Sequence, residues 1–262
     1  MTVSRFGIDT ENIVNTKRDR LYERKLKTPN AAVIALADMQ QRPRPILNIV
    51  TGGETIAIIG RIMHEEIYDP VGMALRYARA GVDAISFFTD GQIYGNGLED
   101  MLLVTRAVQR PILSQDFILD EYHVAEARAA GASALTLYSS VLDPVALRRT
   151  VSLTQRWRMT AIVQIETKEQ IEHIHELSPH VVAIGTLDER DTESDMELLR
   201  ILRPLIPYNI HCMLLDPLAT IENVKKAIDL GVDAIIVDDR LLGHAESASQ
   251  LFECVRSHVK SS

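Results

Sequence analysis

The sequence predicts a (β/α)₈ barrel preceded by a helical extension, and three observations favour this fold. Short apolar runs recur along the chain, they show no alternation of polar and apolar side chains, and helix-forming segments separate them. Strands that are buried on both faces of a parallel sheet have this composition. The eight runs span residues 55–59, 83–88, 111–113, 133–138, 160–165, 181–184, 210–215 and 233–237.

Three near-identical segments give the length of the repeat. They begin at Ala80, Ala130 and Leu230, and in each a glycine ends a helix before a strand starts. The second follows the first by 50 residues and the third follows the second by 100, so one strand and one helix occupy about 25 residues. Eight such units match a (β/α)₈ barrel. A doubly wound open sheet is the alternative, but no Gly-x-Gly-x-x-Gly follows the first run.

Residues 1–50 differ from the repeats and predict a separate helical extension, which leaves residues 51–262 for the barrel. Residues 16–26 are polar, charged and helix-prone, and residues 31–37 form a second helix after a Thr-Pro-Asn cap. Residues 42–45, Arg-Pro-Arg-Pro, predict an extended linker, because proline fixes its own φ and disfavours the α conformation of the residue before it.

Composition excludes several classes of protein. The formal net charge of -8 disfavours attraction to nucleic acid or to an anionic membrane. No apolar run reaches the roughly 18–20 residues of a membrane helix, and the N-terminus has no signal-peptide core. The two cysteines, Cys212 and Cys254, lie far apart and predict a reduced cytoplasmic protein without a disulfide or metal framework. The sequence does not reveal the oligomeric state.

In such a barrel the functional site lies where the strands end at their carboxyl termini. No lysine or cysteine stands at these exits, so a Schiff base or a thiol nucleophile is not expected. Acidic residues predominate there: Asp90, Asp116, Glu166, Asp188, Asp216, Asp238 and Asp239. Taken singly, each acid is more commonly a helix cap than a catalyst.

Converging carboxylates repel one another, so they require protonation, an arginine or a cation. Arg61 and Arg240 are the candidate arginine partners. The candidate ligand-binding residues are therefore Arg61, Asp90, Asp116, Glu166, Asp238, Asp239 and Arg240. A hard cation such as Mg²⁺ or Ca²⁺ is a weaker possibility, with Asp216, Asp238 and Asp239 as its ligands.

Several stretches together resemble a known family. They are Asp69-Pro70, Thr89, Tyr122 and residues 78–86, 97–99, 111–118, 126–131 and 231–234. On these residues, and on the segment around residues 42–48, the chain resembles indole-3-glycerol phosphate synthase, a (β/α)₈ carbon–carbon lyase of tryptophan biosynthesis. The resemblance implies a ring closure in which a carboxyphenylamino-deoxyribulose phosphate loses CO₂ and water. It also implies a lysine general acid, assisting glutamates and a phosphate held by glycine-rich exits of strands seven and eight. No cofactor is implied.

The sequence departs from the family at the positions that the resemblance assigns to chemistry. The strand-one Glu-x-Lys falls on Ile58 and Gly60, the strand-three lysine on Gln115, the strand-five glutamate on Gln164 and the strand-six asparagine on Gly185. The strand-seven Ser-Gly falls on Asp216-Pro217, and the strand-eight Gly-Ser turn falls on Asp238-Asp239-Arg240.

These departures predict that the synthase reaction is lost. Replacing the lysine by Gln115 removes a general acid, which typically contributes about 10²–10⁴-fold to rate. Phosphate binding requires bare backbone N–H groups, whereas Asp216, Asp238 and Asp239 add negative charge and Pro217 removes a donor. We expect a divergent barrel that binds a different small ligand, cationic or neutral and not phosphorylated, or that has a non-catalytic role.

Two alternatives remain open at the level of sequence. One is an active synthase in which another lysine, Lys168 or Lys225, reaches the pocket. The other is a metal-dependent enzyme that uses Asp216, Asp238, Asp239 and Glu166.

Overall fold

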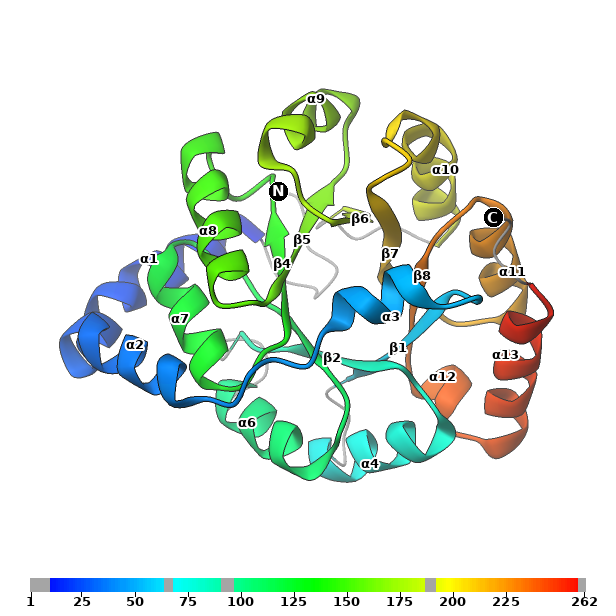
Figure 1. Cartoon of the computed structure of the whole chain (residues 1–262), viewed down its shortest axis with the longest axis horizontal. Helices are drawn as coiled ribbons and strands as arrows, with labels where there is room; N and C mark the ends of the chain where they lie inside the picture. Colours follow the sequence, from blue (N-terminus) through cyan, green and yellow to red (C-terminus); the bar gives the residue numbers. More distant parts are fainter. Residues whose placement is uncertain (1–9, 64–67, 91–96, 187–191, 259–262) are drawn as a thin grey trace.

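Eight parallel strands pair in chain order and close into a barrel, because β1 hydrogen-bonds to both β2 and β8 (Figure 1). The structure is a computed structural model that describes residues 10–63, 68–90, 97–186 and 192–258. The predicted (β/α)₈ fold is confirmed. The strands are β1 (Ala57–Ile62), β2 (Ala84–Phe88), β3 (Ile112–Gln115), β4 (Ala134–Tyr138), β5 (Thr160–Ile165), β6 (Val181–Ile184), β7 (His211–Leu218) and β8 (Ala234–Val237).

Helices surround the barrel. They are α4 (Pro70–Ala80), α6 (Gly97–Ala107), α7 (Glu121–Ala129), α8 (Pro144–Arg156), α9 (Lys168–Leu177), α10 (Thr192–Leu202), the 3₁₀ turn Arg203–Leu205, α11 (Ile221–Asp229), α12 (Asp239–Leu242) and α13 (Ala245–Ser257). The three repeated glycines Gly81, Gly131 and Gly231 have φ values of 107°, 92° and 83°, the left-handed region that a residue without Cβ adopts readily. The glycine stops in the sequence therefore mark helix ends, as predicted.

Three strands continue beyond the ends that were predicted for them. Strand β1 continues to Ile62, so Gly60 and Arg61 lie inside it and are not exits; β3 includes Gln115; β7 runs on through Asp216 and Pro217. The apolar runs end earlier because Gly60 and Arg61 in β1, Ser114 and Gln115 in β3, and Asp216 in β7 interrupt the apolar pattern. The pairing of β7 with β8 also shifts register between Met213 and Pro217.

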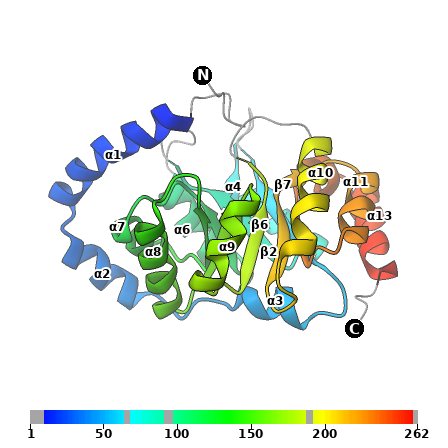
Figure 2. The same cartoon turned by 90° about the horizontal axis from the view of Figure 1, so that it is seen from above.

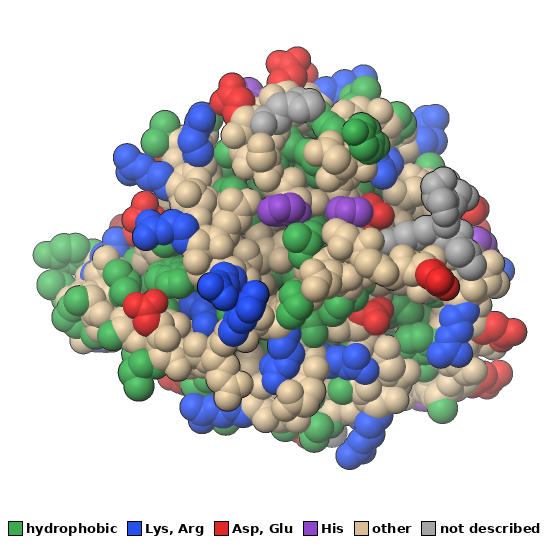
Figure 3. Space-filling view, viewed as in Figure 1, with side chains coloured by type: hydrophobic (Ala, Val, Ile, Leu, Met, Phe, Trp, Pro, Cys, Tyr) green, Lys and Arg blue, Asp and Glu red, His purple; other side chains and the backbone are tan. Residues whose placement is uncertain are grey.

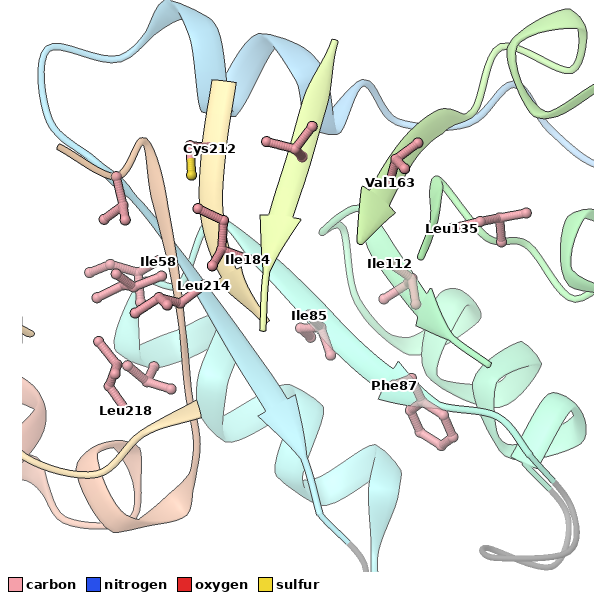
Figure 4. Packing of buried hydrophobic residues seen from close by; sticks show 14 of the residues in the cluster. Ile58, Ile85, Phe87, Ile112, Leu135, Val163, Ile184, Cys212, Leu214 and Leu218 are labelled. Carbon is pink, nitrogen blue, oxygen red and sulfur yellow. The ribbon is translucent and has the colours of Figure 1, made fainter. Parts of the chain in front are cut away.

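Alternating strand residues build two apolar layers. Ile59, Leu113 and Ile162 belong to the cluster inside the barrel. Residues of the opposite parity pack between the strands and the helices, as Figure 4 shows for Ile58, Ile85 and other members of that cluster. Both layers are buried, which explains why the strands read as continuous apolar runs.

Three helices precede the first strand: α1 (Thr10–Lys27), α2 (Asn30–Met39) and the unpredicted α3 (Ile46–Gly52), which crosses the predicted boundary at residue 50. Ile46 and Val50 of α3 join the cluster inside the barrel, and α1 and α3 lie on opposite sides of the barrel (Figure 2). Helix α2 packs on α7. Within the described ranges, no helix has the length and apolar character needed to cross a membrane.

Acidic and basic side chains intermingle on the face of the molecule that carries α3 (Figure 3). This distribution accompanies the formal net charge of -8. The expectation that nucleic acid is not a partner stays a prediction.

Candidate functional site

Lys17 joins two strand-end carboxylates at the mouth, the end of the barrel where the strands reach their carboxyl termini. Its Nζ lies 2.8 Å from Asp90 Oδ2 and also donates to Asp116 Oδ1. Asp90 follows β2 and Asp116 follows its parallel neighbour β3, so the two carboxylates converge. The cation that converging acids require comes from α1 of the extension.

This ion cluster is buried and internally braced. Lys17 is 4% exposed, and the Thr89 hydroxyl donates to Asp116 Oδ2 at 3.2 Å. Burial disfavours the charged form of Lys17, but Asp116 and Asp90 outweigh that effect and raise the pKa of the ammonium. Burial raises the pKa of Asp116, and Lys17 opposes that rise.

Aromatic and aliphatic side chains lie beside the cluster. The Phe117 ring meets the Phe88 ring edge-on at 6.0 Å between centroids and the Tyr138 ring at 5.5 Å. Ile13 and Val14 of α1 are buried in the same apolar cluster. Helix α1 therefore packs apolar side chains and one ammonium against the mouth.

Two neutral amides face the barrel interior where the resemblance assigns a lysine and a glutamate. Gln115 Oε1 accepts a hydrogen bond from the Ser86 hydroxyl. Gln164 Nε2 donates to the carbonyl of Gly185 at 2.6 Å and to Glu166 Oε2 at 3.3 Å. Because both partners of Nε2 are acceptors, the orientation of the Gln164 amide is fixed. Gln164 thus binds both Glu166 and Gly185 through its amide nitrogen.

At the end of β8, where the resemblance implies a phosphate, Asp238 engages the nearby donors of Arg240. Asp238 is 4% exposed and accepts from the backbone N–H of Arg240 at 3.0 Å, at the start of α12. The Arg240 guanidinium binds the same carboxylate, with its Nη2 2.6 Å from Oδ2. The local backbone donor and the nearby arginine are therefore both engaged by Asp238.

The other two acids proposed as metal ligands have different partners. Asp216 Oδ1 lies 3.8 Å from Arg61 Nη1, and Asp239 Oδ1 accepts from Arg76 Nη2 at 2.9 Å and from the Tyr77 hydroxyl at 3.2 Å. Across the described parts of the chain, no group of three or more His, Cys, Asp or Glu residues could hold a metal ion. Asp188 lies outside the described residues.

On strand β1, the two positions that the resemblance assigns to chemistry, Ile58 and Gly60, face the helices. Ile58 packs in the layer between the strands and the helices, and a Cβ added at Gly60 would lie 2.7 Å from Tyr77 Cδ2. The next position is different, because Arg61 Nη2 donates to the Leu215 carbonyl on β7 at 2.6 Å. The interior cation of this strand is therefore Arg61, whereas positions 58 and 60 face the helices.

Lys17 is the site residue that sequence reasoning missed. It lies in a polar helix that was predicted only as an extension, and no motif links it to Asp90 or Asp116. One signal was present: Ile13 and Val14 are the apolar pair of that helix, and Lys17 follows them at helical spacing on the same face. Lys168 and Lys225, the lysines named from sequence, lie on the exposed surfaces of α9 and α11.

Known proteins match this chain over nearly its whole length. A family model described as Indole-3-glycerol phosphate synthase matches residues 11–253. The chain belongs to the indole-3-glycerol phosphate synthase family. A protein of that name from Roseiflexus sp. (strain RS-1) is 28% identical over 257 residues, covering 92% of this chain and 96% of the relative.

Two further relatives of the family agree. Indole-3-glycerol phosphate synthase from Dehalococcoides mccartyi (strain CBDB1) is 27% identical, covering 93% of this chain and 98% of the relative. The protein of that name from Geobacillus kaustophilus (strain HTA426) is 29% identical, covering 88% of this chain and 91% of the relative. The family match begins within α1, so the helix that carries Lys17 lies inside the region shared with indole-3-glycerol phosphate synthases.

Proposed function

We propose that this barrel does not catalyse the synthase ring closure and that its mouth binds a small ligand without a phosphate group. The observation that carries the proposal is the buried Asp238 carboxylate, which accepts from Arg240 N and pairs with the Arg240 guanidinium. A phosphate that approached this turn would meet a negative charge in place of free donors. Repulsion of this kind amounts to several kcal/mol between unit charges about 4 Å apart at an intermediate dielectric.

The inner mouth supports the same proposal. Ring closure with loss of CO₂ and water requires a proton donor. The resemblance assigns a lysine to the position held by Gln115, whereas the other position that it assigns to a lysine, Gly60, faces the helices and cannot serve the mouth. A carboxamide neither donates a proton as a general acid nor carries positive charge. The neutral amides Gln115 and Gln164 suit the recognition of a ligand by hydrogen bonds.

A second candidate function is the synthase reaction itself with Lys17 as the replacement acid. The observation that favours it is the arrival of Lys17 at the mouth, which supplies the lysine missing from the strand ends. Against it, the ammonium already donates to two carboxylates, and these hold its proton.

A synthase assay separates the two candidates. Purified protein is incubated with the carboxyphenylamino-deoxyribulose phosphate, and formation of the indole is followed by fluorescence, with Lys17→Met and Asp116→Asn as matched controls. We expect no turnover above the substrate blank in any of the three proteins. Turnover by the wild type that disappears in Lys17→Met would establish the second candidate, and turnover that survives this change would overturn both assignments.

A further inference from the structure

We infer that the ligand of the mouth carries a primary ammonium group, and that Lys17 occupies the site for this group from within the chain. The inference rests on the proposed function and names its ligand class. The site consists of the Asp90 and Asp116 carboxylates, braced by Thr89. All three residues belong to the barrel, whereas the cation that fills the site belongs to α1.

Groups of the barrel also position Asp116 and Asp90. The Thr89 hydroxyl donates to Asp116 Oδ2 at 3.2 Å and lies 3.0 Å from the Ser114 hydroxyl, so side chains of the barrel orient Asp116. The backbone N–H of Thr89 donates to the Gln115 carbonyl at 3.0 Å, which extends the pairing of β2 and β3 up to Asp90. A second ammonium would meet the same two acceptors.

Two polar side-chain atoms of the described barrel interior are buried without a hydrogen bond. Among the described residues, Gln164 Oε1 and Thr136 Oγ1 are buried, and neither has a hydrogen-bond partner. Gln164 lies two residues after Ile162 on β5, and Thr136 lies two residues after Ala134 on β4. Since Ile162 and Ala134 face the barrel interior, Gln164 and Thr136 face it as well. Gln164 is 0% exposed, and an acceptor that is buried without a donor is costly.

Two aromatic residues lie between Gln164 and the carboxylate pair. Gln164 is the register partner of Tyr138, and the Tyr138 ring lies 5.5 Å from the ring of Phe117, the residue that follows Asp116. A ligand that placed its ammonium at Asp90 and Asp116 would lie against these rings. It could then present an N–H or O–H group to Gln164 Oε1.

Contacts other than those of Lys17 also anchor α1. The helix is also held by buried Ile13 and Val14, by the Arg24–Glu126 ion pair at 2.6 Å, and by the Tyr122 hydroxyl, which donates to the Thr28 carbonyl at 3.0 Å. A buried ion cluster as a whole contributes little net stability compared with apolar side chains of the same volume, although removal of its cation alone is costly. A ligand site explains why three charges are buried at this place.

The geometry restricts the ligand to an unsubstituted ammonium on an unbranched apolar chain. The Nζ to Oδ2 distance of 2.8 Å at Asp90 is a direct charge-assisted hydrogen bond, and methyl groups on the nitrogen would remove the donors. The side chain of Lys17 has four carbon atoms before its nitrogen, so we expect a ligand chain of about this length. A phosphorylated or carboxylate-bearing head group would be repelled by Asp90 and Asp116.

The test uses Lys17→Ala, which removes the internal ammonium and its stem, and n-butylammonium as the probe. Tetramethylammonium and acetate serve as controls for charge and for salt. We expect butylammonium at ~10-fold its Kd to raise the Tm of Lys17→Ala by about 2–4 °C, with no rise from tetramethylammonium. The double variant Lys17→Ala with Asp116→Asn should lose the response. Equal effects of butylammonium and tetramethylammonium on Lys17→Ala would overturn the inference.

A second measurement covers the case in which Lys17→Ala does not fold. In the wild type, 1,5-diaminopentane should compete with Lys17 for the carboxylates and increase the rate at which trypsin cleaves α1 at Arg18 and Arg20 by several-fold, whereas tetramethylammonium should not. An unchanged rate with both compounds would refute the inference. Loss of the amine response without synthase turnover would reject the ligand class only, whereas synthase turnover would reject the proposed function itself.

Discussion

Lys17 Nζ lies 2.8 Å from Asp90 Oδ2, although the two residues are 73 positions apart in the chain. The contact joins the N-terminal extension to the functional end of the barrel, and Asp116 completes it. The extension is therefore part of the mouth as well as a packing element on α7. Any account of what this barrel binds has to include α1.

Replacing Lys17 by Met should lower the free energy of unfolding by about 3–5 kcal/mol at pH 7, because Asp90 and Asp116 would remain buried without their cation. The matched control is Lys25→Met on the same helix. Lys25 pairs with Asp120 at 2.5 Å but is 41% exposed, so we expect a change within about 1 kcal/mol. Urea denaturation of both variants measures the difference. Equal losses of unfolding free energy in the two variants would show that the buried cluster stabilises the protein no more than the exposed ion pair does.

Glu126 should make stability depend on pH. Burial raises the pKa of its carboxyl to about 7, and Arg24 opposes this rise. The folded protein holds the proton more tightly than the unfolded chain does, so stability is full at acid pH and is lost as the pH rises through 7. Between pH 5 and 8 the wild type should lose ~2–3 kcal/mol more than Glu126→Gln does. Glu121→Gln, on the exposed side of α7, is the control and should follow the wild type.

Replacing Asp238 by Gly should create affinity for phosphate. The change removes the carboxylate that now engages Arg240 N and the Arg240 guanidinium, so both become donors for an external anion. We expect inorganic phosphate to bind with a Kd near 1 mM, which corresponds to about -4 kcal/mol, and to bind the wild type at least 10-fold more weakly. Isothermal titration calorimetry measures both. Asp238→Asn keeps a side chain over the donors and should bind no better than the wild type.

Gly60→Ala should be destabilising and should leave the mouth unchanged. A Cβ at this position would lie 2.7 Å from Tyr77 Cδ2 and 3.1 Å from Leu242 Cδ1, so the buried Tyr77 ring would have to move. Such overpacking typically costs about 1–3 kcal/mol. Gly52→Ala is the control, because a Cβ there meets nothing within 4 Å. Thermal unfolding of the two variants compares them, and an undisturbed Gly60→Ala would mean that residue 60 does not face the helices.

The fold could be predicted from the sequence because it repeats one unit of a strand and a helix. Runs buried on both faces, glycine stops at Gly81, Gly131 and Gly231, and a constant unit length each report a local property of one strand and one helix. The ends of β1, β3 and β7 could not be predicted, because polar residues stand there. Arg61 and Gln115 stay in strands by pairing with Ser86 and Phe88, and Asp216 lies at the register shift between β7 and β8. Helix α3 was missed for a related reason. Its Ile46 and Val50 are buried by a barrel interior that local pattern does not reveal.

The site was only partly readable. Asp90 and Asp116 are predicted from the strand ends, and the structure brings them together at Lys17. Arg240 is predicted to partner an acid, and it pairs with Asp238. The common role of such acids as caps is also predicted, and Asp238 caps α12. Lys17 was not predicted, because the contact with Asp116 spans 99 positions and joins two structural layers. Such an ion pair depends on how the helix packs on the barrel, and no local sequence pattern indicates it.

Closure of the barrel makes the two ends of the chain interdependent. Strand β1 begins at Ala57, yet one of its two neighbours is β8, which begins only at Ala234. During synthesis β1 waits with an unpaired edge until more than 170 further residues have been made. A shortened protein that ended before β8 would expose edges on both β1 and β7, which other molecules could then pair with. Strand β8 covers both edges in the closed barrel.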